Sequence, residues 1–169
     1  MAAITAADLT GADRERGFEA AVRAESGRLF GLAFTILRDR WEAEDSVQDT
    51  MAVAWRAWDQ LIDPTRRESW LTRICVRKAV AQRRGMLRRT LFTWEARQGA
   101  PADPTATSNP DLDQAYRRLS GHQRAVLALH YHYGYTLDEC ADLIGCRPGT
   151  ARSHLGRALD KLRRDMADA

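Results

Sequence analysis

The sequence has 169 residues, of which 44% are hydrophobic and 29% charged, with a formal net charge of +3. This composition is that of an ordinary globular protein and excludes a fibrous or disordered chain. Three scattered cysteines exclude a disulfide framework, and no apolar run approaches the roughly 18 residues that a membrane span needs, so we expect a cytoplasmic protein without a membrane span.

Three helices are predicted in the first half. Apolar residues recur at intervals of three and four from Phe18 to Ile36, and the same period runs from about Trp41 to Trp58. Asp59 to Thr65 contains an Asp-Pro pair and predicts a loop. A third helix follows, which places Trp70 and Ile74 inward with an arginine-rich face outward. Trp70 is therefore interpreted as a core residue.

The pattern of the third helix ends after Arg89. The stretch 99–111 contains three prolines among small and polar residues, which is the chemistry of a linker. Leu91, Phe92 and Trp94, just before it, are predicted to cover the first core, and a contact with a partner is the alternative.

Capping signals divide the second half into short helices. The helical period returns at Leu112 and breaks before Ser120, which forms a capping-box pattern with Gln123 and opens a helix that runs to about Gly134. Thr136 and Glu139 repeat the pattern, and the helix that they open is predicted to end at Gly145.

Thr136–Leu155 has the spacing of a helix-turn-helix. Ala141 is small where the second helix would cross, and Pro148 suits the first turn of that second helix. The face of the second helix opposite its apolar stripe carries short or basic side chains, which suit the major groove of DNA. These side chains and their flanks are Arg147, Thr150, Arg152, Ser153, Arg157 and Lys161.

No strand pattern is found, so the predicted fold is all-α: two small helical bundles joined by a flexible linker, the second containing the helix-turn-helix. The predicted divisions are a tail (1–17), a first domain (18–92), a linker (93–111) and a second domain (112–169).

The acidic and basic residues are segregated along the sequence. The stretch 38–63 holds seven acids against three bases, 64–90 nine bases against one acid, and 147–164 six bases against one acid. Two basic surfaces predict two contacts with DNA, although solvated helix faces without a partner are the alternative.

The second domain resembles region four of the extracytoplasmic-function sigma factors. The resemblance is carried by three segments: Leu119–Leu127, Tyr135–Cys146 and Gly149–Ala158. It implies that this module reads the minus-thirty-five promoter element, with His154 joining the DNA-binding residues named above. The sequence departs from the usual pattern at Arg147, Ala151 and His154, so the bases that are read do not follow from the resemblance.

The first domain resembles region two of the same family through Glu44–Thr50. Asp45, Gln48 and Asp49 share one helical face at spacings of three and four. The resemblance implies that this face binds the clamp helices of the largest subunit of RNA polymerase, where carboxylates can form charge-assisted pairs with arginines. An acidic helix start that only balances the helix dipole is the alternative, but it leaves Gln48 and Asp49 unexplained.

Ser69–Arg84 is similar to the family's next element, which opens the minus-ten element of the promoter. The implied mechanism is capture of a base that leaves the stack, followed by binding of the melted nontemplate strand. The family often has asparagine where Arg77 stands and a polar residue where Ala81 stands. The residues expected to bind this element are Asp63, Arg66, Arg67, Arg73, Arg77, Lys78, Arg83 and Arg84.

The resemblance further implies a contact with the flap of the second-largest polymerase subunit and an anti-sigma factor as a candidate regulator. No enzyme motif and no cofactor-binding motif is found, and the histidines and cysteines lack the spacing of a metal site. The predicted function is that of a sigma factor, which directs promoter-specific initiation. The alternative is a helix-turn-helix regulator that binds duplex DNA without polymerase.

Overall fold

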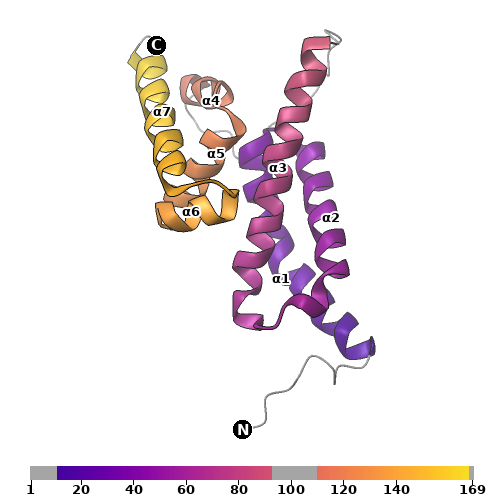
Figure 1. The fold of residues 1–169 in the computed structure, drawn as a ribbon. Coiled ribbons are helices and arrows are strands. Elements are labelled where there is room, and N and C mark those ends of the chain that lie inside the picture. The colour runs from indigo at the N-terminus through magenta and orange to yellow at the C-terminus, as the bar shows by residue number, and fades with distance from the viewer. Residues whose placement is uncertain (1–10, 93–109, 168–169) are drawn as a thin grey trace.

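The computed structural model describes residues 11–92 and 110–167, with the side chains of 86–92 and 110 left aside. Every regular element in these two ranges is helical, which confirms the predicted all-α class. The helices form two groups, as Figure 1 shows. None of the helices in the described part of the chain combines the length and apolar character that crossing a membrane requires.

The first group consists of α1 (Gly11–Leu37), α2 (Arg40–Arg56) and α3 (Arg67–Phe92), which pack side by side. Asp39 begins α2 by accepting a 3.0 Å hydrogen bond from the backbone N–H of Glu42. Two short 3₁₀ turns, η2 (Trp58–Gln60) and η3 (Pro64–Arg66), occupy the loop between α2 and α3.

Both long helices exceed their predicted bounds. α1 begins at Gly11 rather than Phe18, and α3 continues to Phe92 rather than ending near Arg89. The extra turns of α1 are held by Arg14, whose guanidinium stacks on the ring of Trp55 at 3.8 Å and bonds Asp59 at 2.9 Å. These contacts are long-range, so helical periodicity does not reveal them.

The second group consists of α4 (Pro110–Arg117), α5 (Gly121–Leu127), η4 (Ala128–His132), α6 (Leu137–Ile144) and α7 (Pro148–Ala167). Both predicted capping boxes are present, at Ser120 and at Thr136. Gly145 ends α6 with a φ of 83°, the left-handed conformation that favours glycine. The helix predicted to reach Gly134 instead becomes a π-helical turn at η4.

The two groups share one buried apolar cluster. Leu29 and Ile36 of α1, Val80 of α3, and Val126 and Leu129 of the second group all belong to it. α3 packs on α5 and α6, and α1 packs on α5 (Figure 1). The two bundles predicted from the sequence are therefore in direct contact. The tether predicted over 93–111 and the placement of Trp94 fall largely outside the described residues, while residues 110 and 111 already belong to α4.

Candidate polymerase and nucleic-acid interfaces

The predicted polymerase-binding residues share an exposed face of α2. Asp45, Gln48 and Asp49 are exposed, whereas Ala43 and Val47 on the opposite face are buried. The carboxylate of Asp49 lies 3.2 Å from the ammonium of Lys78 on α3. The face thus presents the carboxylate of Asp45 to solvent, together with the solvent-exposed ion pair between Asp49 and Lys78. Exposed ion pairs of this kind contribute little to stability, so a partner can replace them at low cost.

Trp41 extends this face, and sequence reasoning missed it as a functional residue. Its side chain is 61% exposed, although it lies in the first turn of α2. Trp41 precedes Asp45 by four residues and Gln48 by seven, so the three side chains share one helical stripe. Tryptophan is enriched among the residues that dominate binding energy at interfaces. Its spacing to Asp45 was the signal that could have found it.

A pocket of about 450 Å³ opens between the η2–η3 loop and the start of α3. Its lining combines two guanidinium groups, a carboxylate, a hydroxyl, an indole ring and backbone atoms. Groups of these kinds can stack on a planar polar ring and form hydrogen bonds with its edge. The lining residues are Gln60, Leu61, Ile62, Asp63, Arg66, Ser69, Trp70 and Arg73. Three of the predicted minus-ten residues, Asp63, Arg66 and Arg73, therefore meet at one pocket.

Hydrogen bonds and aromatic packing fix the walls of this pocket. The carboxylate of Asp63 accepts hydrogen bonds from the backbone N–H of Thr65 at 2.9 Å and from its hydroxyl at 2.6 Å. These bonds hold the pKa of Asp63 below its usual value, so the carboxylate is charged at neutral pH. Trp70 is half-buried and packs on Trp58 with ring centroids 6.3 Å apart. It serves the predicted core and also forms part of the pocket wall.

Ile62, at the tip of the loop, has 90% of its side chain exposed. Sequence reasoning included it in the loop but gave it no role. An exposed aliphatic side chain beside a polar pocket can act as an apolar wedge between bases.

The remaining predicted minus-ten residues lie elsewhere on α3. Arg67 is half-buried, and Lys78 pairs with Asp49. Arg77 and Arg84 point to the second helical group, where Arg77 bonds backbone carbonyls of α6 and Arg84 approaches His122 at 3.3 Å. Arg83 is also half-buried, beside Gly121.

The basic run that looks continuous in sequence is therefore split between the pocket and the junction of the two groups.

The face of α7 that the sequence predicts to read DNA is open to solvent. Ala151, Leu155 and Ala158 are buried, and Arg147, Thr150 and Arg157 on the other side are exposed. The other predicted residues have local partners. Arg152 bonds Asp138 at 2.9 Å, Ser153 donates to the carbonyl of Gly149, and Lys161 donates to the carbonyl of Arg118 at 2.7 Å.

His154 turns from this face toward α5. Its ring stacks on that of His122 with centroids 5.1 Å apart. Burial lowers the pKa of both histidines below the ordinary 6.5. Arg84 and His154 add to the lowering for His122, and Arg157 and Arg84 for His154.

Burial raises the pKa of all three cysteine thiols above the ordinary value. Burial raises the pKa of Cys75 and of Cys140 to about 11, so both remain protonated thiols at neutral pH. Within residues 11–92 and 110–167, no group of three or more His, Cys, Asp or Glu side chains is arranged to hold a metal ion.

Comparisons with known proteins assign both helical groups to one family. A family model described as Sigma-70 region 2 matches residues 21–90, and one described as Sigma-70, region 4 matches residues 111–162. The chain is 29% identical to the ECF RNA polymerase sigma factor SigL of Mycobacterium tuberculosis over 142 residues, and this alignment covers 80% of each chain. It is 26% identical to the RNA polymerase sigma-E factor of Streptomyces coelicolor over 152 residues, and this alignment covers 88% of the present chain and 85% of the sigma-E factor.

Solved structures with the same fold are also similar. The sigma factor RpoE of Bartonella quintana, solved in complex with the anti-sigma factor NepR, superposes with a TM-score of 0.70 at 25% identity, over 90% of this chain and 98% of that one. CnrH, solved in complex with the cytosolic domain of CnrY, superposes with a TM-score of 0.60 at 24% identity, over 98% of this chain and 94% of that one, and supports the fold alone.

Proposed function

This chain belongs to the extracytoplasmic-function subfamily of sigma factors, which are transcription initiation factors and not catalysts, and we propose that it binds core RNA polymerase and directs initiation at promoters with a minus-ten and a minus-thirty-five element. The observation that carries the proposal is the stripe of Trp41, Asp45 and Gln48. These side chains are exposed on α2, within the region that matches the sigma-70 region 2 family.

The stripe suits a basic, helical partner such as the polymerase clamp. Carboxylates opposite arginines form charge-assisted pairs that fix orientation, and electrostatic attraction speeds encounter. Burial of the Trp41 indole against the partner would supply the apolar contact energy that exposed ion pairs do not provide. A duplex DNA partner is excluded for this face, because its carboxylates would repel phosphates.

We propose that the pocket beside the η2–η3 loop receives a base of the nontemplate strand. Taking a base out of the stack costs a few kcal/mol, which pocket contacts and phosphate contacts must offset. The ordered carboxylate of Asp63 can accept hydrogen bonds from an exocyclic amine. Trp70 lines the pocket, Ile62 can separate the neighbouring bases, and Arg66 and Arg73 can bind the flanking phosphates.

The α7 helix is proposed to read the minus-thirty-five element in the major groove. Thr150 and Arg147 lie at its start, where a recognition helix contacts base edges, and Arg157 lies further along on the exposed face. Arg152 is oriented by Asp138, so it is suited to a phosphate contact of fixed register.

An anti-sigma partner is proposed on the same grounds of similarity. RpoE of Bartonella quintana was solved with the anti-sigma factor NepR, and this chain covers nearly all of that fold. We propose that a comparable protein covers the surfaces described above.

The test reverses the charge of the two carboxylates on the exposed face of α2. Asp45→Lys with Asp49→Lys should lower the affinity for core RNA polymerase at least 100-fold in a fluorescence anisotropy titration, with the far-UV circular dichroism spectrum and the urea unfolding curve unchanged. The matched control, Glu15→Lys with Glu19→Lys, reverses two exposed acids on α1 and should bind within about threefold of the wild type. Wild-type affinity in the Asp45 and Asp49 variant would remove the basis of the proposal.

The polymerase-independent regulator makes a different prediction. It requires the isolated chain to bind a specific duplex tightly, whereas a sigma factor should select promoter sequences only together with core polymerase. Selection of sequences from a random duplex library, with and without core polymerase, decides between the two.

A further inference from the structure

The loop between α2 and α3 has few contacts of its own to hold its shape. Its two 3₁₀ turns, η2 and η3, have three residues each, and none of these residues is buried. Ile62, between the two turns, is 90% exposed. Short 3₁₀ turns have poor hydrogen-bond geometry, and segments with few buried contacts open easily. The shape of the pocket beside this loop therefore depends on how the two ends of the loop are held.

Arg14 of α1 holds the end of the loop that follows α2. Its guanidinium donates a 2.7 Å hydrogen bond to the carbonyl of Trp55, in the last turn of α2, and forms a 2.9 Å ion pair with Asp59 in η2. The same guanidinium stacks on the Trp55 ring at 3.8 Å. A cation is favoured at the C-terminal end of a helix, and a planar guanidinium can make several such contacts at once. Arg14 thus joins α1, the end of α2 and the first residues of the loop.

A series of aromatic rings continues from this contact to the pocket wall. Phe18, four residues after Arg14 on α1, packs on Trp55 and Trp58 with ring centroids 5.0 and 5.1 Å apart. Trp58 begins η2 and packs in turn on Trp70, which lines the pocket, at 6.3 Å. Aromatic pairs at these separations contribute more than the area that they bury. A displacement of the first turns of α1 would therefore reach the pocket through packed rings.

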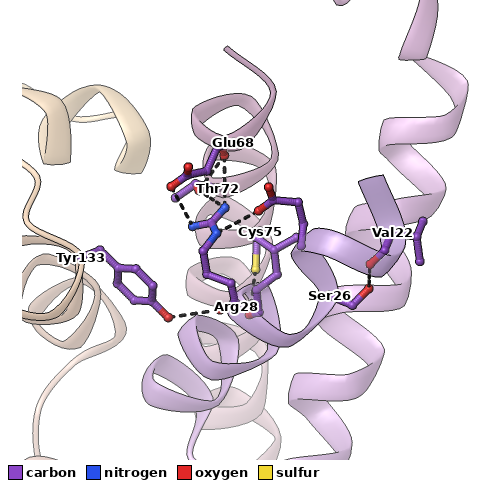
Figure 2. Close-up of polar contacts among 9 residues, drawn as sticks. Val22, Ser26, Arg28, Glu68, Thr72, Cys75 and Tyr133 are labelled. Atoms are coloured by element: carbon purple, nitrogen blue, oxygen red, sulfur yellow. Dashed lines mark hydrogen bonds and ion pairs between the residues drawn. The ribbon is translucent and has the colours of Figure 1, made fainter. Parts of the chain in front are cut away.

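Arg28 of α1 holds the other end of the loop. Its guanidinium donates to the hydroxyl of Thr72 at 2.9 Å and to the carbonyl of Glu68 at 3.3 Å, and it lies 3.7 Å from the Glu68 carboxylate, as Figure 2 shows. Glu68 lies in the first turn of α3, directly before Ser69 of the pocket lining. A 2.9 Å ion pair with Glu25 orients the Arg28 side chain. The start of α3 is therefore tied to α1 as well.

Both arginines belong to the same continuous helix, α1. They are 14 residues apart, which is about four turns, so they project from nearly the same side of α1 at a separation of roughly 21 Å along its axis. A helix is stiffer than a loop over this length, so α1 fixes the distance between the end of α2 and the start of α3. Arg14 and Phe18 precede residue 21, where the match to sigma-70 region 2 begins, so that match gives them no role.

We propose that α1 acts as a brace for the pocket, with Arg14 as a positioning residue that keeps the η2–η3 loop in the shape that accepts a base. The inference rests on the proposed capture of a nontemplate base, and it adds residues that act through the loop rather than through contact with DNA. A pocket that is already formed avoids the cost of ordering the loop on binding. When only a fraction of the chains has the pocket formed, the apparent affinity for the strand falls by that fraction.

The test replaces Arg14 with alanine in the full chain bound to core RNA polymerase. The first probe is a labelled single-stranded oligonucleotide that the wild-type complex selects from a random-sequence pool. The second probe is the same strand without the base whose removal weakens wild-type binding most. Arg14→Ala should weaken binding of the intact strand about fivefold, the typical net effect of one hydrogen bond. It should bind the strand without that base as the wild type does, and its affinity for core polymerase should not change.

Two further measurements show whether Arg14 acts through the loop. Asp59→Ala removes the other partner of the ion pair, and the variant with both changes should bind the intact strand no more weakly than Arg14→Ala alone. Amide hydrogen exchange of residues 57–66 should be faster in Arg14→Ala than in the wild type. The matched control, Arg23→Ala with Glu19→Ala, removes an exposed ion pair of α1 and should change neither the exchange nor the strand affinity.

The outcomes separate the brace from the proposed function. Unchanged exchange in the loop of Arg14→Ala would overturn the brace. Wild-type affinity for the intact strand, an equal loss on the strand that lacks the base, or losses that multiply in the double variant would overturn it as well. If the wild-type chain binds no polymerase or its complex selects no strand, the proposed function fails instead, and the exchange measurement still decides whether Arg14 holds the loop.

Discussion

Arg124 of α5 is 1% exposed and donates hydrogen bonds to the carbonyls of Ile36, Tyr116 and Arg117. Replacing it with methionine tests how much these buried hydrogen bonds stabilise the fold. Methionine fills a similar volume but leaves three carbonyl oxygens without the donor that reaches them at 2.6, 2.7 and 3.2 Å. Unsatisfied buried acceptors cost about 1–3 kcal/mol each, while the guanidinium no longer has to be desolvated. We therefore expect the free energy of unfolding to fall by about 3 kcal/mol, which at this chain length lowers Tm by roughly 6–12 °C.

The assay is urea unfolding at pH 7, followed by circular dichroism and by tryptophan fluorescence. Arg163→Met, an exposed arginine on α7, is the control and should change stability by less than about 0.5 kcal/mol. Arg124→Lys should fall between the two, since one ammonium cannot span carbonyls on two helices as a planar guanidinium does. A methionine variant as stable as the wild type would refute the view that these carbonyls need the cation.

Three further predictions follow from single features. Trp41→Ala should weaken binding to core polymerase about tenfold or more in the anisotropy titration, with no loss of stability, because the indole is exposed. Thr136→Ala should lower the free energy of unfolding by about 1 kcal/mol through loss of the capping box of α6, as measured by urea unfolding. The folded-state pKa values of His122 and His154 lie below 6.5, so the unfolded chain binds more protons as the pH falls below that value. Stability should therefore be retained above pH 6.5 and decline below it, and His122→Gln with His154→Gln should flatten the decline in thermal unfolding between pH 7.5 and 5.

Local signals predicted the elements of the second group well. The capping boxes at Ser120 and Thr136, the left-handed Gly145 and the position of Pro148 all depend on residues within one or two turns of each other, and all are present. The π-helical turn at η4 was not predictable in this way. Its geometry coincides with tertiary contacts of Tyr133 with α1, which leave no mark on helical periodicity.

The basic run of α3 shows why charge alone cannot assign a surface. A row of arginines after Pro64 indicates a DNA contact, and Arg66 and Arg73 do line a pocket suited to one. Arg77, further along the same helix, instead donates to the carbonyl ends of α6. Both uses exploit the same property, since a guanidinium binds phosphate oxygens and helix-terminal carbonyls through the same donors. The sequence cannot distinguish them, because the competing acceptors are backbone atoms placed by the packing of the second group.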